Sequence, residues 1–579
     1  MNLNVSNRNG RIYLYIEKGY RDKNGKVRKS LVQSLGYVDE LEKKYPDPIS
    51  YFRKVAIDMT NEEKADRKKS KTIDMNEELC IGDEGTMNLG YALLLKVYHV
   101  LGISRFLNNK SRKESFEFNA NSIMSLLVVS RLLSPGSKKK AFDERNKYFE
   151  RFDFSLDDVY RSLTYFDKIS AELQRHTYEG VRSQYGSDTS VIYYDVTNYY
   201  FEISKQDELR KYSGNAKQKR KKPVVQMGLA MDRDGIPMHY ELFPGNTLDK
   251  ETFRSVIGNV RKNYGTGRIV VVSDMGLITG DNINYLVGSK PEKPRNGYVF
   301  SFSVRGGTDI FKKYVLDETG YTDKNGKHVD ENTDFKIKER LIARDINVTM
   351  SNGKTKSKTV YEKQVIFWAR KYQRKARAER AEMITKAEAL ISNPKKFTKA
   401  TSYGAAAYVD NLEYDKNTGE VLETGNLLNL KRSKIEEEEK YDGYYSIVTS
   451  ELHLTATEIV DTYRGLWEIE ETFKITKSDL EARPVYVWDP DHIDAHFLTC
   501  FIALTIIRII QKKLQRKYSP EEIINCLNKI ECLLEDENTY LFGYRSEVSD
   551  DLGNAFGINF KKKRLQRADI KKIIGDVKK

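Results

Sequence analysis

The stretch between residues 189 and 290 constrains the fold most, because its apolar residues change from a strand period to a helical period and back. The predicted elements are a strand over 191–194 that runs into Asp195, strands over 224–231 and 237–243, a helix over about 249–262, and a strand over 268–272 that ends at Ser273-Asp274. Three antiparallel strands, a helix and a fourth strand that returns by a crossover predict an α/β fold.

Two aspartates occupy unusual places in this pattern. Asp195 lies among β-branched and aromatic residues of a strand expected to be central, and Asp274 ends the apolar strand 268–272. A carboxylate inside a sheet is costly unless it is paired or binds a metal. Open α/β sheets build their sites at strand ends. Each Asp alone could instead be a helix cap or a turn residue, but two on neighbouring strands favour a shared site.

A third acid, Glu470, lies on a helix predicted over 456–478. The apolar stripe of this helix comprises Ile459, Tyr463, Leu466, Trp467 and Phe473. Glu470 falls on the same stripe, and Lys477, seven residues later, emerges on the Glu470 face, where it could hold a phosphate. Glu468 and Glu471 fall off the stripe and are expected to be surface charges. The alternative for Glu470 is a buried ion pair.

Two aspartates and one glutamate offer hard oxygen ligands, which suit Mg²⁺, with Mn²⁺ as a substitute. Two such ions about 4 Å apart could activate an attacking water or 3′-hydroxyl and stabilise the leaving oxygen. This chemistry cuts or transfers phosphodiesters without a covalent protein intermediate. A zinc site at His492 and His496 is the alternative metal centre, but no further ligand is evident for it.

The charge of the chain suits a polyanionic partner. Lys and Arg number 98 against 84 acids, so 98 − 84 gives a net charge of +14, and the pI is about 9.1. The apolar run 497–507 is shorter than the roughly 20 residues needed to cross a bilayer. No signal segment is visible, and the four cysteines form no CxxC pair. We therefore expect a soluble intracellular protein with no membrane contact.

The periodicities divide the chain into six parts. They are a small N-terminal β unit over 1–60, a helical region over 80–185, an α/β region over 186–300, a β-rich insertion over 301–440, a second α/β part over 441–515, and a helical tail over 516–579. The insertion carries a basic helix predicted over 365–391, with Arg370 and Arg374. Trp368 on this helix could stack on DNA, or could simply be an aromatic residue of an amphipathic face.

At these residues the chain resembles the DDE transposases of bacterial insertion sequences. It is most similar to the group with a β-rich insertion before the catalytic Glu and a Tyr, Arg, Glu and Lys signature on one helix. The resemblance rests on three segments: 194–198 (YDVTN), 272–277 (VSDMGL) and 463–477. Tyr463, Glu470 and Lys477 keep the spacing of the signature. Its arginine, expected three residues after the tyrosine, is Leu466 here, and Arg464 is the nearest substitute.

The resemblance implies a ribonuclease-H-like catalytic core formed by 186–300 and 441–515. It implies that Asp195, Asp274 and Glu470 are catalytic and hold Mg²⁺, and that the N-terminal β unit and the helical region bind DNA. The DNA contacts expected by this resemblance are Tyr463, Arg464, Lys477, Lys219, Arg220, Lys221, Lys222, Arg370 and Arg374. The alternative for the basic run 217–222 is a flexible solvated loop.

The function expected from the resemblance is cut-and-paste DNA transposition. The protein would cleave the ends of its element with a metal ion and join them to target DNA. Its partners would be terminal inverted repeats, target DNA and a second copy of itself on paired ends, in the cytoplasm of a bacterial cell, where it would associate with the nucleoid. Two rival functions remain at this stage: a related DNA endonuclease that never joins strands, and an inactive DNA-binding repressor.

Overall fold

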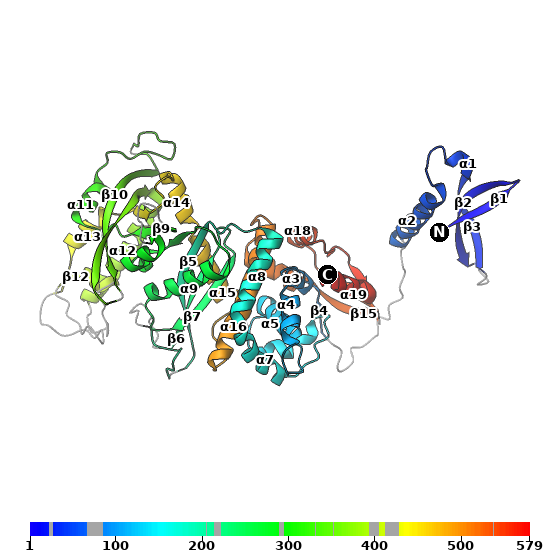
Figure 1. Cartoon of the computed structure of the whole chain (residues 1–579), viewed down its shortest axis with the longest axis horizontal. Helices are drawn as coiled ribbons and strands as arrows, with labels where there is room; N and C mark the ends of the chain where they lie inside the picture. The colour runs from blue at the N-terminus through cyan, green and yellow to red at the C-terminus, as the bar shows by residue number, and fades with distance from the viewer. Residues whose placement is uncertain are drawn as a thin grey trace. The chain divides into compact units, whose positions relative to one another are not determined.

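The computed structural model describes residues 1–21, 27–66, 85–203, 205–213, 222–288, 295–330, 332–350, 352–392, 404–410, 428–536 and 538–579 (Figure 1). The chain divides into two compact units, Met1–Glu84 and Gly85–Lys579. We describe each unit by itself.

The first unit is a three-stranded antiparallel sheet with two helices. Its elements are β1 (Asn2–Arg8), β2 (Arg11–Arg21), β3 (Val27–Tyr37), α1 (Val38–Leu41) and α2 (Pro48–Asp66). The predicted alternation along β2 places Leu14 and Ile16 on one face, where both are fully buried, and α2 packs on β1. The β unit therefore includes a helix that continues to residue 66.

An eight-stranded mixed sheet organises the second unit. In sheet order the strands are β10 (Phe335–Thr349), β11 (Thr355–Ala369), β14 (Tyr444–Thr449), β9 (Gly297–Phe302), β8 (Val270–Ser273), β5 (Val191–Tyr200), β6 (Val224–Met231) and β7 (Pro237–Pro244). The three central strands β9, β8 and β5 run parallel, and every other neighbouring pair is antiparallel. The predicted order of three antiparallel strands, helix α9 (Asp249–Asn263) and a returning strand is confirmed.

The stretch expected as an insertion extends this same sheet. Its strands β10 and β11 form a long hairpin, and β11 pairs with β14 from Lys363 opposite Thr449 onward. The prediction of a helix from 365 was wrong, because 355–369 is strand and α12 (Arg370–Ser392) begins only at Arg370. Cross-strand pairing outweighs the helical period there, since β11 is buried between two neighbours. The other elements of this region are α10 (Gly280–Val287), α11 (Asp309–Leu316), η4 (Gly404–Tyr408), β12 (Val409–Asp410), β13 (Asn429–Leu430) and α13 (Arg432–Glu439).

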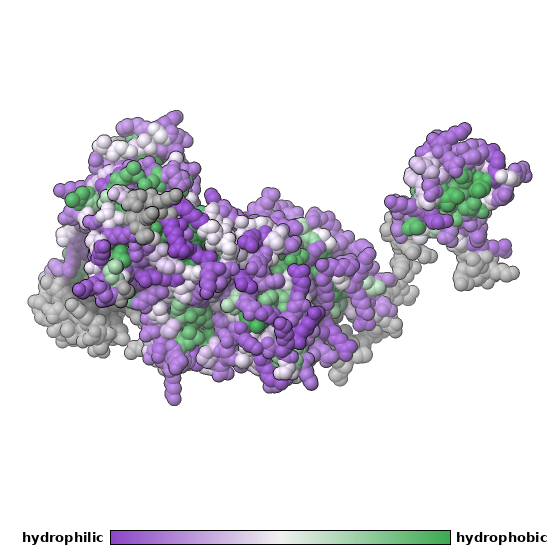
Figure 2. Space-filling view, in the orientation of Figure 1, coloured by the Kyte–Doolittle hydropathy of each residue, from purple (hydrophilic) through white to green (hydrophobic). Residues whose placement is uncertain are grey.

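Helices from both ends of the unit surround one long apolar helix, α16 (Pro490–Lys513) (Figure 1). Those that contact α16 are α3 (Tyr91–Val100), α5 (Ala120–Leu133), α7 (Leu156–Lys168), α8 (Ser170–Tyr185) and α17 (Pro520–Lys529), and α4 (Ile103–Ser111) and α6 (Lys138–Asp143) pack on α5. Among the described residues α16 alone has the length and hydropathy of a membrane span, and 94% of its apolar window is buried in the protein. The face of the second unit seen in Figure 2 is mostly hydrophilic, with scattered apolar patches.

The C-terminal tail is not purely helical, which corrects the prediction for 516–579. Strands β15 (Glu531–Asp536), β16 (Thr539–Phe542) and β17 (Arg564–Gln566) form a small sheet with β4 (Met87–Asn88). Helices α18 (Glu547–Phe556) and α19 (Arg567–Val577) complete the tail. β15 and β16 form a local hairpin, β17 pairs with β16, and β15 also pairs with β4, which lies more than 400 positions earlier in the chain.

Candidate active site

Asp195 and Asp274 lie level with each other on two adjacent parallel strands. Tyr193 pairs with Val272, and the backbone of Asp274 is still extended (φ −79°, ψ 168°), so the register carries Asp195 to a position opposite Asp274. Adjacent strands are about 4.8 Å apart, and residues in register point to the same face. On the other side of β8, Ser273 pairs with Phe300, which puts Ser301 beside Asp274. A polar row of three side chains therefore crosses the centre of the sheet.

Two hydroxyl groups hold the carboxylate of Asp274. Ser301 Oγ donates to Asp274 Oδ1 over 2.6 Å, and Tyr463 Oη reaches the same oxygen at 3.5 Å. Burial, and then the charges of Asp274 and Glu470, raise the pKa of Tyr463 above its ordinary value, so this phenol stays a donor. The second oxygen, Oδ2, accepts no hydrogen bond within the described part of the chain.

The helix predicted over 456–478 is two helices, α14 (Ala456–Arg464) and α15 (Trp467–Lys477). Gly465 separates them, and a Cβ on this glycine would lie 1.9 Å from Tyr193 Oη. Tyr193 Oη in turn donates to Thr462 O over 3.2 Å. Only a glycine lets the end of α14 approach β5 this closely, and the break changes which side chains of α15 face the protein.

The break reverses the predicted burial of the acids on α15. Glu468 is buried and Glu471 half-buried, and both form ion pairs with Arg508 of α16. Glu470 is exposed, and Trp467 is 54% exposed. The expectation that Glu470 faces the core and that Glu468 and Glu471 are surface charges was therefore wrong. The reason is that α15 packs on α16 through a stripe that is out of phase with α14.

Glu470 and Lys477 lie on the face of α15 that meets β5. They are seven residues apart, two helical turns, and therefore share one side of the helix. Lys477 Nζ donates to Thr197 Oγ1, and Thr197 stands two residues after Asp195, on the same face of β5. This contact brings Glu470 close enough for its charge to act on Asp195. The structure thus gathers Asp195, Asp274 and Glu470.

The three carboxylates repel one another at Asp195. Burial, and after it the charges of Asp274 and Glu470, raise the pKa of Asp195 to about 7, while the backbone N–H of Val196 acts in the opposite direction. In the described part of the chain none of the three forms an ion pair with Lys, Arg or His. Negative charge is therefore concentrated here without a cation bound to it.

These donors fit a divalent ion by their chemistry. No three His, Cys, Asp or Glu side chains among the described residues already surround one point as ligands. The three carboxylates are nevertheless hard oxygen donors: Asp195 and Asp274 are in register, and the charge of Glu470 acts on Asp195. A dication would offset their mutual repulsion. Asp195, Asp274 and Glu470 are the residues that could hold it, with the second oxygen of Asp274 free to coordinate.

We expect Mg²⁺ to stabilise the protein more at about pH 8 than at about pH 6. The pKa of Asp195 in the folded protein, about 7, lies above its ordinary value of 3.8, so stability falls as the pH rises from the lower value through the higher one, because the unfolded chain loses its proton first. A bound dication should restore it, and the melting temperature should rise by a few degrees at the higher pH. In Asp195→Asn this pH difference should vanish. An equal Mg²⁺ effect at both pH values in the wild type would contradict the expectation.

The described residues among the expected DNA contacts are distributed over four places, of which α12 is treated below. Tyr463 and Lys477 lie at the carboxylates, as described above. Arg464 forms an ion pair with Asp461 at 3.1 Å and lies over the Phe335 ring. Lys222 pairs with Glu202 beside the Tyr200 ring. Lys219, Arg220 and Lys221 lie outside the described residues.

Helix α12 borders a cavity beside Asp274, and Arg380 is its basic residue in the lining. The cavity measures about 630 Å³ and extends from Asp274, Ser301 and Tyr463 to α12, η4 and α13. Its aromatic lining is Phe302, Tyr372, Tyr408, Tyr441, Tyr444, Tyr445 and Tyr463. Arg374 is exposed on α12, whereas Arg370 pairs with Asp334 at 2.6 Å. Trp368 is a strand residue that donates to Asp442 O, so its expected place on the helix was wrong.

Three polar residues of this region were not predicted as site residues from the sequence: Ser301, Thr197 and Arg483. Ser301 could have been found only from the pairing of β8 with β9. Thr197 stands two residues after Asp195 and therefore shares its face, which is a usable signal. Arg483 lies in the loop after α15 and, with Lys477, lines a second cavity of about 310 Å³ next to β5.

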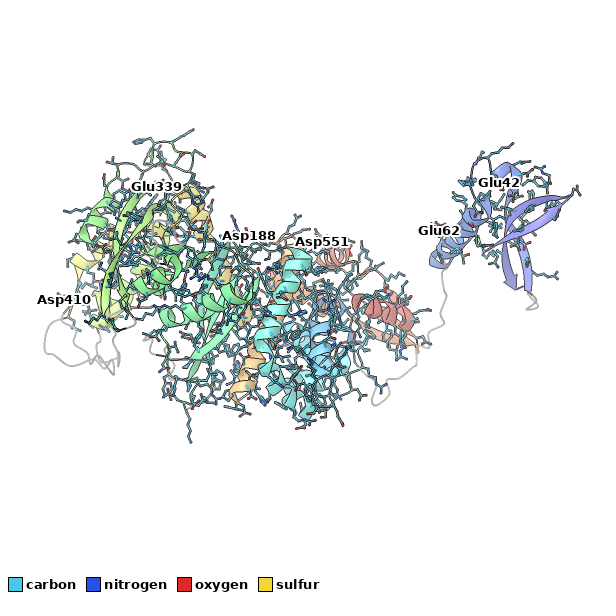
Figure 3. All side chains as sticks on the ribbon, viewed as in Figure 1. Glu42, Glu62, Asp188, Glu339, Asp410 and Asp551 are labelled. Atoms are coloured by element: carbon cyan, nitrogen blue, oxygen red, sulfur yellow. The ribbon has the colours of Figure 1, made fainter. Side chains whose placement is uncertain are left out.

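An acid outside this cluster shows how a carboxylate with a cationic partner differs from Asp195. Asp188, labelled in Figure 3, lies just before β5 and accepts a hydrogen bond from Arg233 at 3.3 Å. Hydrogen bonds from Ser190 hold the pKa of Asp188 below its ordinary value. Asp195 has the opposite shift and no cationic partner, which marks it as a candidate functional group.

Comparisons with known proteins give two family matches. A model of the IS1634 family transposase N-terminal domain matches residues 3–70, and a model of the transposase DDE domain matches residues 327–506. The second range includes Glu470 and lies after Asp195 and Asp274. No curated protein matches. A solved structure, the Mos1 transposase paired-end complex with left transposon end, is 10% identical, with a TM-score of 0.11. That match covers 41% of this chain and 64% of the other, so this chain spans less than two thirds of that one.

Proposed function

Because the chain is a DDE-type insertion-sequence transposase, we propose that it moves its element by cutting both DNA ends and joining them to target DNA. Asp195, Asp274 and Glu470 form the reaction centre. The observation that carries this proposal is the level placement of Asp195 and Asp274 on adjacent parallel strands, with the charge of Glu470 acting on Asp195.

The proposed catalytic core is ribonuclease-H-like and consists of residues 186–300 and 441–515. The support is the strand arrangement: β5, β6 and β7 form an antiparallel meander, and β8 and β9 add to β5 in parallel. Residues 301–440, between the second Asp and the Glu, form the insertion, whose β10 and β11 lengthen the sheet. The aromatic cavity beside Asp274 is lined by residues of both the core and the insertion, and in this proposal it receives a DNA strand.

Two Mg²⁺ ions, which Mn²⁺ could replace, would activate a water or 3′-hydroxyl for attack and stabilise the leaving oxygen. The residues of the chain supply the rest. Ser301 and Tyr463 orient Asp274 so that one oxygen remains free, and Lys477 offers a cation to a DNA phosphate next to Asp195. Arg508 holds the opposite face of α15, which sets the position of Glu470.

The proposed partners are the terminal inverted repeats and the target DNA. The net charge of +14 supports a polyanionic partner. The N-terminal unit and the helical region over 80–185 would recognise the element ends, and two copies would act on paired ends in the bacterial cytoplasm. No observation favours the endonuclease that never joins strands or the inactive repressor.

Removal of residues 1–84 should abolish selective binding to the element ends and leave the second unit folded. The two units are compact separately, so the circular dichroism spectrum and melting transition of 85–579 should persist. Binding is measured by anisotropy with labelled end DNA against a scrambled duplex. If the truncated chain still prefers end DNA, recognition belongs to another part of the protein.

The proposed function is tested by a combined cleavage and joining assay. Purified protein, Mg²⁺ or Mn²⁺, a labelled element end and a target plasmid should yield cut ends and plasmids that carry the label. Cleavage without joined product would identify the endonuclease instead. Binding without cleavage with either metal would identify the repressor.

A further inference from the structure

A polar cleft lies beside Asp195, where β5 continues beyond its neighbour. Strand β8 pairs with β5 only through Tyr193, so the following residues of β5 have no strand partner on that side among the residues that the structure describes. The cleft measures about 310 Å³. Its lining is Val196, Thr197, Asn198, Gln226, Asp249, Lys477 and Arg483. A DNA strand that reaches Asp195 therefore has room beside the reaction centre.

Two cations line this cleft without an acidic partner. Within the described residues Lys477 bonds only to Thr197, and Arg483 makes no ion pair or hydrogen bond and lies 5.3 Å from the centre of the Tyr200 ring. Burial, and then the charge of Arg483, lower the pKa of Lys477 to about 8, so the two cations are close enough to repel. The one acid of the lining, Asp249, accepts from Gln226 over 2.6 Å. An anion between the cations would relieve their repulsion.

The backbone that carries Arg483 is held in place from two helices. Arg131 of α5 donates to Leu480 O at 3.2 Å and to Glu481 O at 3.3 Å. His496 of α16 faces Lys138 Nζ with Nδ1, so its other nitrogen, Nε2, is free to donate to Ala482 O at 3.1 Å. Arg483 follows directly. These hydrogen bonds fix the backbone next to Arg483 before a ligand binds. Binding therefore costs little conformational entropy in this loop.

The arginine expected in the helix signature is absent from this cleft. Position 466 holds a leucine that is 5% exposed, and Arg464 is engaged by Asp461. Arg483 comes from outside the helix, yet it stands next to Lys477. Arg483 is therefore positioned to bind the same ligand as Lys477.

We propose that Lys477 and Arg483 together bind one phosphate of the DNA backbone next to the cleaved position, and that Arg483 supplies the arginine that the helix signature lacks. The inference rests on the proposed function, since it assigns a part of the same substrate to the same site. The alternative is that both cations only balance the charge of Asp195, which requires no contact with DNA.

The test combines protein variants with DNA in which single phosphates are replaced by neutral methylphosphonates. Full-length wild type, Arg483→Ala, Arg483→Lys and Lys474→Ala are compared by anisotropy with precut end DNA in Ca²⁺. Arg483→Ala should weaken binding about tenfold to hundredfold, and Arg483→Lys less. Lys474 is exposed on α15 and does not line the cleft, so its variant should change binding at most about twofold.

One methylphosphonate position near the cut should weaken wild-type binding and have no further effect on Arg483→Ala. If a methylphosphonate at every position weakens DNA binding by Arg483→Ala as much as it weakens DNA binding by the wild type, Arg483 does not contact a phosphate and the inference is overturned. A coupling found for Arg464→Ala instead would also overturn it. DNA binding is measured under conditions without cleavage. A wild type that binds DNA but never cuts it would disprove the proposed function, and the binding data would still decide whether Arg483 contacts a phosphate.

Discussion

Asp195→Asn, Asp274→Asn and Glu470→Gln should each lower DNA cleavage and strand joining by about a thousandfold or more. Each change keeps the shape of the side chain and removes one negative charge from the set that we propose to hold Mg²⁺. Groups that act as one unit give losses that do not add, so the triple variant should be little worse than a single one. Cleavage of a labelled element end with Mg²⁺ measures the effect.

The same variants should still bind end DNA, because the carboxylates repel phosphate. Glu521→Gln, an exposed carboxylate at the start of α17, is the matched control and should cut at the wild-type rate. Cleavage that survives Glu470→Gln would show that another acid completes the centre. Asp249, whose charge also raises the pKa of Asp195, would then be tested next.

Arg508→Ala should destabilise the second unit by about 3 to 5 kcal/mol. Arg508 is buried and donates to Thr472 Oγ1 at 2.7 Å, to Glu468 O at 3.0 Å and to Glu471 Oε2 at 3.0 Å. Truncation leaves buried Glu468 without this partner. The melting temperature should fall by several degrees. Because α15 carries Glu470 and Lys477 on its other face, the cleavage rate should also be lower than that of the wild type at temperatures where the variant is still folded.

Arg508→Lys should give an intermediate loss, since an ammonium keeps the charge but cannot form the forked set of bonds. Lys513→Ala alters an exposed cation on the same helix and should shift stability by no more than about 0.5 kcal/mol. Calorimetry or thermal circular dichroism separates the three variants. If Arg508→Ala has the same melting temperature as the wild type, the bonds of Arg508 do not contribute to the stability of the second unit.

Local patterns determined the central part of the sheet. The strand before Asp195, the helix α9 and the strand before Asp274 each have an apolar period that the chain itself displays, and a crossover of this length makes β5 and β8 parallel neighbours. The capping box of Thr455 and Glu458 likewise marked the start of α14. Short-range backbone geometry is sufficient for features of this kind.

The orientation of α15 was beyond local patterns. Glu470 entered the candidate site because it lay on an apolar stripe, yet its side chain is exposed and the acids expected at the surface are paired with Arg508. The chain passes close to Tyr193 at Gly465, between α14 and α15, where a Cβ would lie 1.9 Å from Tyr193 Oη. Packing between distant segments therefore accompanies the change in which glutamates of α15 are buried.

The sequence by itself thus determined which residue types are available at the centre: two strand aspartates, a helical glutamate and a lysine two turns later. Only the tertiary structure decided that Ser301 holds Asp274, that β10 and β11 extend the sheet, and that Arg483 joins Lys477. Each of these depends on pairing or packing between segments far apart in the chain. Such contacts are chosen by burial and shape across the whole fold, and no periodicity within one segment encodes them.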